Sequence, residues 1–424
     1  MKVDFKITLF KVIFSLTLLI VTSISLVLLG AKNRELIKDY YYQAIGFGDK
    51  YINLAIGEPD SINRTKFHGY TDLNNYRSEA QEYFLKDKLN LGANGHLVVL
   101  KNTVVNDSGI NIITNSGLFI KLDTQLKVKK MQLIGNLLKN FEFQRFDHGI
   151  IGVLWLEAEK ILVYYTSAIP GKPELMSAEL SILDLKDNSL LDSVSLGSEK
   201  IGSGNLGGGV ALDPKSDRAV LAIGDFGLPE KLETWKKAQD DHLKFGKILA
   251  VNLDAEKTRI VSVELLGKGT RNPQGLVIND SGIFFVEHGP KGGDELNKLI
   301  SNSNFGWPLR SYGTGYVPPY DRYDLPGEYF TDPLFYFSPS IAPSSLANCS
   351  SFFKDSGYTG CMVIGALRGK GILFLKFDPT MKFIQSYEKL DLDRRIRDIK
   401  VHENNVYAFT DKLSVIKITY TRFQ

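Results

Sequence analysis

Short apolar runs alternate with polar turns along most of this chain, from about residue 91 to its end. The runs are rich in Val, Ile, Leu and Phe, and Gly, Asp, Asn and Ser bound them. Such a pattern predicts many short β-strands. A unit of apolar strands and turns recurs at intervals of roughly 45 to 65 residues, which suits propeller blades with insertions. Six units can be traced, beginning near His96, Ile150, Gly208, Gln274, Ile341 and Ile396.

The sequence therefore predicts an all-β fold, a six-bladed β-propeller over residues 91–424. A double-sheet sandwich is the alternative, although its strands rarely recur as such blocks. One charged insertion, Leu228–Phe245, has a helix-prone composition. Residues 31–90 contain tyrosines and charges without a sustained period, and we interpret them as a stalk or linker.

The first 30 residues are interpreted as a membrane anchor or a signal segment. Val12–Gly30 contains 19 residues without a charge, and at ~1.5 Å per residue this run spans roughly the hydrocarbon core of a bilayer. Three lysines precede the run and three basic residues follow it, so the positive-inside signal is weak. Leu29 and Ala31 fit a cleavage site poorly, which favours an N-terminal transmembrane helix over a cleaved signal peptide. We therefore expect a membrane-anchored protein with its propeller on the periplasmic or extracellular side.

The amino-acid composition argues against some classes of binding partner. The 424 residues are 43% hydrophobic and 23% charged, as in ordinary globular proteins. Fifty-one basic and 48 acidic residues give a net charge of +3, and no basic run is interleaved with aromatics, which argues against nucleic-acid binding. In an exported domain Cys349 and Cys361 are able to form a disulfide, and two buried free thiols are the alternative. Neither cysteine has a histidine at zinc spacing.

Residues 271–308 hold the densest candidate chemistry. Two glycine-rich turns, a carboxylate cluster, an Arg-Asn pair and a Trp-Pro pair lie within this segment. Glycine lets a backbone approach a ligand closely. His288-Gly289-Pro290, followed by Gly292-Gly293-Asp294-Glu295, offers carbonyl and carboxylate oxygens together, the ligands that Ca²⁺ prefers. A tight loop between two strands is the alternative interpretation.

Four blocks of this segment resemble the family of PQQ-dependent soluble aldose/glucose dehydrogenases, also called the glucose/sorbosone dehydrogenase family. They are RNPQGL (271–276), EHGP (287–290), GDELN (293–297) and NFGWP (304–308), in the family's order and spacing. Similarity extends over roughly residues 90 to 420. The resemblance implies a six-bladed propeller that binds pyrroloquinoline quinone (PQQ) and Ca²⁺.

The resemblance also assigns residues to the cofactors. Arg271, Asn272, Arg395 and Arg397 match PQQ-binding positions, and Arg368 matches a family lysine with the same role. The carbonyls of Gly289 and Pro290 match those that hold the Ca²⁺ beside PQQ, and Glu295 matches a carboxylate in the same turn.

Arg395 and Arg397 support this assignment from their spacing alone. They lie two residues apart in an expected strand, so both guanidinium groups point to one face. Two like charges side by side cost energy unless an anion neutralises them. PQQ is a tricarboxylate, and the arginine fork matches carboxylate oxygens. A solvated strand face is the alternative.

The sequence departs from the family at the catalytic base. The family's histidine corresponds to Asn205, and an arginine of the same motif corresponds to Gly209, whereas the partner aspartate corresponds to Asp225. An amide does not accept a proton near neutral pH. His148 and Asp225 are therefore the candidate bases, with a surface or capping role as the alternative for His148.

The sequence thus predicts PQQ- and calcium-dependent oxidation of a sugar or related alcohol by hydride transfer to the quinone. The acceptor of the electrons is unknown. The alternative is a catalytically impaired propeller that binds a ligand or a protein, because Asn205 replaces the histidine.

Overall fold

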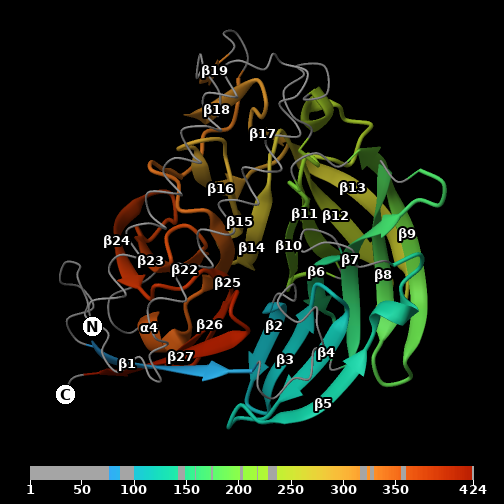
Figure 1. Ribbon diagram of the computed structural model, residues 1–424. Coiled ribbons are helices and arrows are strands. Elements are labelled where there is room, and N and C mark those ends of the chain that lie inside the picture. Colours follow the sequence, from blue (N-terminus) through green and yellow to red (C-terminus); the bar gives the residue numbers. More distant parts are fainter. Residues whose placement is uncertain are drawn as a thin grey trace, which may run out of the picture. The chain divides into compact units, whose positions relative to one another are not determined.

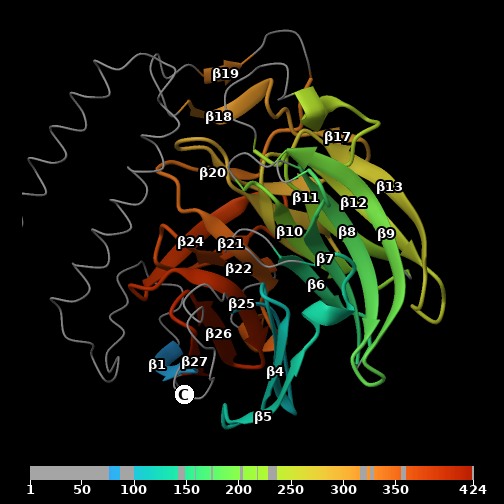
Figure 2. The same ribbon diagram turned by 45° about the vertical axis from the view of Figure 1, so that its right-hand side comes forward.

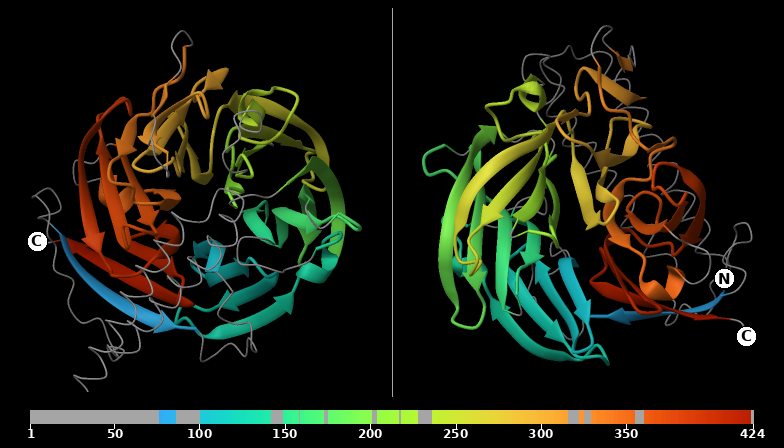
Figure 3. Two further views of the ribbon diagram at one scale, coloured as in Figure 1. Left: turned by 45° about the horizontal axis from the view of Figure 1, so that its top comes forward. Right: turned by 180° about the vertical axis from the view of Figure 1, so that it is seen from behind.

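The computed structural model describes residues 76–85, 100–141, 149–157, 159–172, 175–200, 204–216, 218–227, 236–315, 322–324, 329–354 and 360–422. Within these residues, six antiparallel blades are arranged around a common axis (Figures 1 and 3). The prediction of a six-bladed all-β propeller is therefore confirmed, and a sandwich is excluded.

The first three blades follow one another along the chain. The first contains β2 (Leu100–Asn106), β3 (Gly109–Thr114), β4 (Leu118–Leu122) and β5 (Val128–Leu133). The second contains β6 (Ile150–Trp155), β7 (Lys160–Ala168), β8 (Leu175–Asp184) and β9 (Ser189–Lys200). The third contains β10 (Gly207–Leu212), β11 (Arg218–Ile223), β12 (Lys247–Leu253), β13 (Ile260–Lys268) and the short parallel β17 (Ser303–Asn304).

The other three blades complete the ring. The fourth contains β14 (Pro273–Asn279), β15 (Gly282–Glu287), β16 (Asp294–Leu299) and β20 (Phe335–Phe337). The fifth contains β21 (Pro343–Asn348), β22 (Gly360–Ala366), β23 (Gly371–Phe377) and β24 (Ile384–Asp391). The sixth contains β25 (Ile396–His402), β26 (Asn405–Thr410), β27 (Ser414–Arg422) and β1 (Tyr76–Phe84). Outside the blades lie the hairpin of β18 (Arg310–Thr314) and β19 (Arg322–Asp324), the 3₁₀ turns η4 (Gly135–Leu137) and η5 (Lys236–Gln239), and α4 (Ser351–Lys354).

The sixth blade corrects the predicted boundary of the stalk. β1 comes from residues that the sequence pattern assigned to a linker, yet it pairs antiparallel with β27 along its whole length, from Tyr76↔Arg422 to Phe84↔Ser414. An N-terminal strand thus closes a blade that is otherwise C-terminal. The strand is hidden in the sequence because its inward residue Glu82 is polar, and the buried guanidinium of Arg394 neutralises it at 3.1 Å.

Burial explains why these segments form strands. Nearly every residue of β11 and β12 is buried, as expected for middle strands covered on both faces, whereas the outer β13 alternates with solvent. Neighbouring blades pack face to face, as the second and third blades do in Figure 2. Leu162 and Tyr164 of the second blade share one apolar cluster with Leu221 and Leu249 of the third. The core is therefore a ring of interfaces between blades.

Strand direction places the functional candidates on one face. In each antiparallel blade, the first strand begins where the second ends, as with Pro273↔Glu287 and Pro343↔Ala366. We call this the start face. Three candidates lie one or two residues before the first strand of a blade: Asn205, Arg271 and Arg395. Two others follow a second strand: Asp225 and Arg368.

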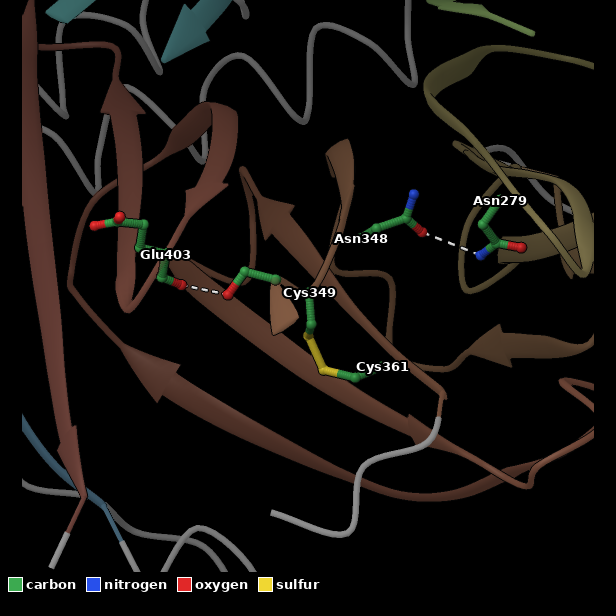
Figure 4. The surroundings of a disulfide bond; sticks show 6 residues. Asn279, Asn348, Cys349, Cys361 and Glu403 are labelled. Carbon is green, nitrogen blue, oxygen red and sulfur yellow. Dashed lines mark hydrogen bonds between the residues drawn. A yellow bond between two sulfur atoms is a disulfide. The ribbon is translucent and has the colours of Figure 1, made fainter. Parts of the chain in front are cut away.

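The two cysteines of the fifth blade form a disulfide and are not free thiols. Cys349, just after β21, forms a disulfide with Cys361 in β22 (Figure 4). The backbone N–H of Cys349 also donates to the carbonyl of Cys361 at 3.2 Å. The bond joins neighbouring strands at the end of the blade away from the start face.

The predicted membrane segment, residues 1–30, lies outside the described residues. In the part of the chain that the structure describes, no helix has the length and apolar character needed to cross a bilayer.

Candidate active site

The carboxylate of Asp225 lies at the start face, immediately after β11, and accepts three hydrogen bonds. Its Oδ1 accepts from Asn205 Nδ2 at 3.0 Å and from the backbone N–H of Gly227 at 2.8 Å. Its Oδ2 accepts from the indole Nε1 of Trp307 at 2.7 Å. Asn205, which corresponds to the family's histidine, is therefore in direct contact with the partner aspartate.

Two features make Asp225 suitable for proton transfer. Loss of solvation raises the pKa of Asp225 above its usual value, although the charge of Arg271 and the hydrogen bonds from Asn205 and Trp307 oppose the shift. Oδ2 accepts one hydrogen bond, and a carboxylate oxygen has two lone pairs, so Oδ2 retains capacity for one more donor. The environment thus raises the pKa of the Asp225 carboxyl and leaves Oδ2 able to accept one more hydrogen bond.

Arg271 lies beside this carboxylate. Its Nη1 donates to the carbonyls of His288 and Gly289, both at 3.0 Å, and its guanidinium lies 5.4 Å from the ring of Trp307. The backbone N–H of Asp225 donates to the carbonyl of Arg271 at 2.9 Å, which ties the third blade to the fourth. Arg271 is therefore held between two carbonyls and an aromatic face, beside the carboxylate of Asp225.

Asn272 is held within the wall of the site. Its Oδ1 accepts from the backbone N–H of Gly207 at 3.1 Å and from Gln274 Nε2 at 2.8 Å. Its Nδ2 is 3.3 Å from His288 Nδ1, and His288 Nε2 is 3.0 Å from the carbonyl of Pro343. Because that carbonyl only accepts, His288 carries its proton on Nε2, and the ring shapes the loop as a fixed spacer.

The turn proposed for Ca²⁺ already makes internal hydrogen bonds. The carbonyl of Gly289 accepts from Arg271, and the carbonyl of Pro290 accepts from the N–H of Gly293 at 3.1 Å. A Cβ on Gly289 would come within 1.7 Å of the carbonyl oxygen of Gly293, so only glycine fits there. Each carbonyl has a second lone pair for a cation, but a cation on Gly289 would lie next to the guanidinium of Arg271.

A second group of oxygen ligands is buried beneath this turn. Glu287 and Glu295 lie opposite each other in β15 and β16, and both are almost fully buried. Asn297 Nδ2 donates to Glu287 at 3.2 Å and to Glu295 at 3.1 Å, whereas the buried Oδ1 of Asn297 has no partner among the described residues. Burial raises the pKa of both carboxyls, and their mutual repulsion adds to the shift of Glu295. Arg271 and Arg310 offset part of these shifts by their charge, and a shared proton or a cation would relieve the remaining repulsion.

The sixth blade supplies an anion for its own arginines. Arg395 Nε donates to Asp411 Oδ2 at 2.8 Å, and Arg397 Nε donates to the other oxygen of the same carboxylate. Asp411 thus neutralises part of the charge of this arginine pair and leaves one positive charge in the trio. Arg368, after β22, is exposed, and none of the described residues pairs with it.

The innermost strands surround a small axial cavity of about 50 Å³. Gly208, Gly209, Gln274, Ser345, Asp398 and Lys400 are among its lining residues. A Cβ on Gly209, the position of the family's arginine, would come within 3.0 Å of Leu276 Cβ on the next blade. Close packing between the blades therefore accompanies the loss of that arginine.

A further set of possible metal ligands lies at the opposite face. Asp107, His402 and Glu403 come from the β2–β3 and β25–β26 turns, and their ligand atoms lie within 4.8 Å of one another. His402 Nε2 is 2.9 Å from Asp107 Oδ1. All three are half-buried or exposed, and the group is separate from the Asp225 site.

The structure thus joins Asn205, Asp225, Arg271 and Asn272 into one site and gives Arg395 and Arg397 a shared partner. His148 lies outside the described residues. Three neighbours of these residues were not assigned from the sequence: Trp307, Asp411 and Glu287. The block NFGWP pointed to Trp307, and EHGP pointed to Glu287, but no signal in the sequence linked Asp411 to the arginines.

Comparison with known proteins now identifies the family. A model of the Glucose / Sorbosone dehydrogenase family matches residues 133–416, more than half of the chain. The chain belongs to this family. It is 31% identical over 158 residues to the aldose sugar dehydrogenase YliI of Escherichia coli (strain K12), an alignment that covers 36% of this chain and 42% of that protein. The chain spans about half the length or less of the curated relatives it matches, 50% and 42% for two of them.

Solved structures agree on the fold of this glucose/sorbosone dehydrogenase family member. The apo-form of the soluble aldose sugar dehydrogenase from E. coli matches with a TM-score of 0.62 at 20% identity, covering 81% of this chain and 100% of that chain. The PQQ-bound aldose sugar dehydrogenase from Streptomyces coelicolor matches with a TM-score of 0.55 at 17% identity, covering 81% and 99%. At these identities the likeness concerns the fold alone.

Proposed function

We propose that this propeller binds PQQ with Ca²⁺ and oxidises a sugar or a related alcohol by hydride transfer to the quinone. Family membership supports the reaction class. The observation that carries the proposal for this chain is Asp225, held by Asn205 and Trp307 beside Arg271, with acceptor capacity left on Oδ2.

The charges of the start face fit an anionic cofactor. Arg271 contacts carbonyls and an aromatic ring, Arg368 is exposed, and Arg395 and Arg397 share the single carboxylate of Asp411. Four guanidinium groups therefore lie at the start face with two carboxylates, Asp411 and Asp225. A tricarboxylate offers the missing negative charge, and each guanidinium fork matches a carboxylate geometrically.

The turn at Gly289 and Pro290 fits Ca²⁺ less well than the buried pair of Glu287 and Glu295 does. At Gly289 and Pro290 a cation would share a carbonyl with Arg271, so an anion must separate the two positive groups. The buried carboxylates of Glu287 and Glu295 fit a divalent cation by charge. The buried Oδ1 of Asn297, which has no partner among the described residues, offers a further oxygen ligand. Bound at the quinone, Ca²⁺ would polarise the carbonyl that receives the hydride.

This chain's own residues would handle the proton. Asp225 is the acceptor whose contacts the structure gives: Asn205 and Gly227 orient the carboxylate through Oδ1, leaving Oδ2 directed at Trp307 and able to accept a substrate hydroxyl. A positioned base contributes ~10²–10⁴-fold to a rate. His148 remains a second candidate base.

We also propose that the protein is exported and membrane-anchored through its N-terminal segment. The charge-free run Val12–Gly30 supports an anchor. The Cys349–Cys361 disulfide supports an oxidising compartment, where such bonds persist. The electron acceptor would then be a membrane or soluble carrier on the same side of the membrane.

The second candidate function is a ligand- or protein-binding propeller without catalysis. Asn205 favours it, because the amide that contacts Asp225 replaces the histidine of the family and does not take up a proton. Fold alone does not decide between the two candidates.

Titration separates them. The full-length protein, purified in detergent, is titrated with PQQ in the presence of Ca²⁺, and dye reduction is then followed with a panel of aldoses. We expect saturable PQQ binding and sugar-dependent dye reduction. PQQ binding without reduction would favour the binding protein, and no PQQ binding would remove the cofactor assignment.

A further inference from the structure

Lys247, the first residue of β12, is fully buried and points its ammonium group at three backbone carbonyls. Nζ donates to the carbonyl of Phe245 at 2.7 Å, of Lys237 at 2.8 Å and of Ala238 at 3.1 Å. All three ammonium donors are therefore used. A buried charge is costly, so a lysine retained here in place of an apolar residue needs an explanation.

The carbonyls belong to η5 and the turn that follows it. Within the described residues, no carboxylate contacts this ammonium. Asp240 and Asp241 act on it only through their charge, and Asp241 is paired with Lys268 at 2.9 Å. The carbonyl of Lys237 also accepts from the N–H of Asp240 at 3.1 Å, and that of Ala238 accepts from the N–H of Gly269 at 2.9 Å. Lys247 therefore adds a charged donor to the carbonyls at the end of η5, where a cation is favourable.

Two glycines let η5 dock tightly. A Cβ on Gly246, which has a φ of 67°, would come within 2.6 Å of Ala238 Cβ. A Cβ on Gly269 would come within 2.7 Å of Gln239 Nε2 and 2.4 Å of Asn304 Oδ1. The third blade is thus shaped to accept η5 at a fixed position.

The last residue of η5 reaches the active site. Gln239 Nε2 donates to the carbonyl of Trp307 at 2.7 Å and to Asn304 Oδ1 at 3.0 Å, and Asn304 Nδ2 donates back to Gln239 Oε1 at 2.7 Å. The N–H of Trp307 donates to the carbonyl of Gly269 at 2.9 Å. Both backbone polar groups of Trp307 are therefore fixed, and its indole extends to Asp225 and over Arg271.

We propose that Lys247 is a positioning residue of this site: its ammonium holds η5 so that Gln239 fixes Trp307 against Asp225 and Arg271. The placement of Trp307 stands on the hydrogen bonds alone. Its consequence for turnover rests on the proposed function.

The proposal makes the position of Trp307 depend on pH. A neutral amine has two donors and a lone pair, so deprotonation removes one hydrogen bond and sets the lone pair against a carbonyl oxygen. Burial lowers the pKa of Lys247 to about 8, with Asp240 and Asp241 opposing the shift and Lys268 and Lys244 adding to it. Lys237, whose carbonyl is one of the acceptors, is itself paired with Glu199.

Deprotonation of Lys247 loosens η5 locally, but its effect on the free energy of unfolding of the whole protein has the opposite sign. The folded-state pKa lies below the unfolded value, so the unfolded chain binds more protons between about pH 8 and the usual lysine range. The contribution of Lys247 to the free energy of unfolding therefore rises with pH in that window. A change at Trp307 near pH 8 would thus report local loosening, since this group does not favour unfolding there.

Tryptophan emission tests the proposal. In a full-length Trp155→Phe/Trp235→Phe background, Trp307 is the remaining tryptophan of three. We expect its emission to shift in a single transition with a midpoint near pH 8, the pKa of Lys247. Lys247→Met should abolish the transition and show the high-pH emission already at pH 7.

Lys244→Met is the matched control. Lys244 lies in the same segment, but among the described residues its Nζ donates only to the carbonyl of Val263, at 3.4 Å. This variant should keep the wild-type emission at pH 7 and a single transition, whose midpoint rises slightly because the charge of Lys244 no longer lowers the pKa of Lys247. Should Lys247→Met fail to fold, the pH titration of the unaltered lysine decides alone. An emission that is constant from pH 7 to 9.5, or identical in folded Lys247→Met, overturns the proposal.

Turnover provides a separate readout. If the chain oxidises sugars, Lys247→Met should lower kcat by roughly 10²-fold, the loss expected for a misplaced active-site group, and remove the decline of kcat near pH 8. If the chain shows no oxidation at all, the proposed function fails, and the emission experiment still decides whether Lys247 positions Trp307.

Discussion

Asp225 and the pair Arg395/Arg397 both lie at the start face, but they differ in the groups that contact them. Neutral donors contact Asp225, whereas a carboxylate contacts the two arginines. Asp225 is held by an amide, an indole and a backbone N–H, which are neutral groups, with Arg271 alongside. Arg395 and Arg397 point at a shared carboxylate, Asp411, and are 48% and 23% exposed.

The difference separates a site built for reaction from a site built for binding. Fixed neutral dipoles orient a carboxylate without neutralising it, so its proton affinity is set by solvation. Half-exposed guanidinium groups, in contrast, exchange one carboxylate for another at small cost. We therefore expect changes at Asp225 to affect rates and changes at Arg395 and Arg397 to affect cofactor affinity.

The largest effect is expected for Asp225→Asn. Removing the proton acceptor should lower kcat by ~10²–10⁴-fold while PQQ affinity stays nearly constant. Because the pKa of Asp225 is raised, wild-type activity should fall on acidification at a higher pH than an ordinary aspartate would give. Steady-state rates against pH measure both.

Asp393→Asn provides the control for this variant. Asp393 is an exposed carboxylate, paired with Lys370 at 3.0 Å, and its change should leave kcat and the pH profile unaltered. A His148→Ala variant with the larger loss would transfer the role of base to His148.

Next in size is the double variant Arg395→Ala/Arg397→Ala. Charge-assisted hydrogen bonds contribute ~1.5–3 kcal/mol each, but these groups are partly exposed and shared with Asp411. PQQ affinity should therefore fall by about 2–3 kcal/mol in total, with kcat at saturation little changed. Fluorescence or calorimetric titration measures the loss.

Lys382→Ala/Lys389→Ala removes the same net charge from the fifth blade and should leave PQQ affinity nearly unchanged at physiological ionic strength. Equal losses in both double variants would mean that the arginines act only through the overall field.

A smaller effect is expected from Ca²⁺ at the buried carboxylate pair. At about tenfold its Kd, a ligand stabilises the folded state by about 1.4 kcal/mol, which thermal unfolding detects. Glu295→Gln should abolish this gain. Because burial raises the pKa of Glu287 and Glu295, protons compete with the cation, so the gain should be larger at pH 8 than at pH 6.

Glu264→Gln, an exposed carboxylate of β13, should retain the full stabilisation by calcium. If Ca²⁺ stabilised Glu295→Gln as much as wild type, the pair would hold a shared proton instead of a metal.

The smallest effect is expected for Asn205→His. A histidine beside Asp225 would restore the base that the family uses at this position, so kcat should rise. Asn205 is 7% exposed, however, and the larger ring must displace its neighbours. We expect a gain below about tenfold, or ~1.4 kcal/mol in the activation free energy. A decrease would show that the pocket has closed around the amide.

The six blades were predicted mainly from the resemblance to the family, and strand period and turn residues, which are local signals, supported the prediction. It failed for β1, since Glu82 faces inward against Arg394 and breaks the apolar alternation. The contact between Asn205 and Asp225 followed from the resemblance, because both residues stand in aligned motifs. Asp411 was not predictable, since its link to Arg395 and Arg397 depends on the register of β25 and β26, which places Ile396 opposite Thr410.

The most direct measurement is single-turnover reduction of bound PQQ. The full-length protein is loaded with PQQ and Ca²⁺ and mixed with excess aldose, and the absorption spectrum of the cofactor is followed with time. Our account predicts that the quinone is reduced without an external acceptor, at a rate that falls on acidification and is largely lost in Asp225→Asn. A cofactor that binds but stays oxidised with every aldose would contradict it and identify a binding propeller.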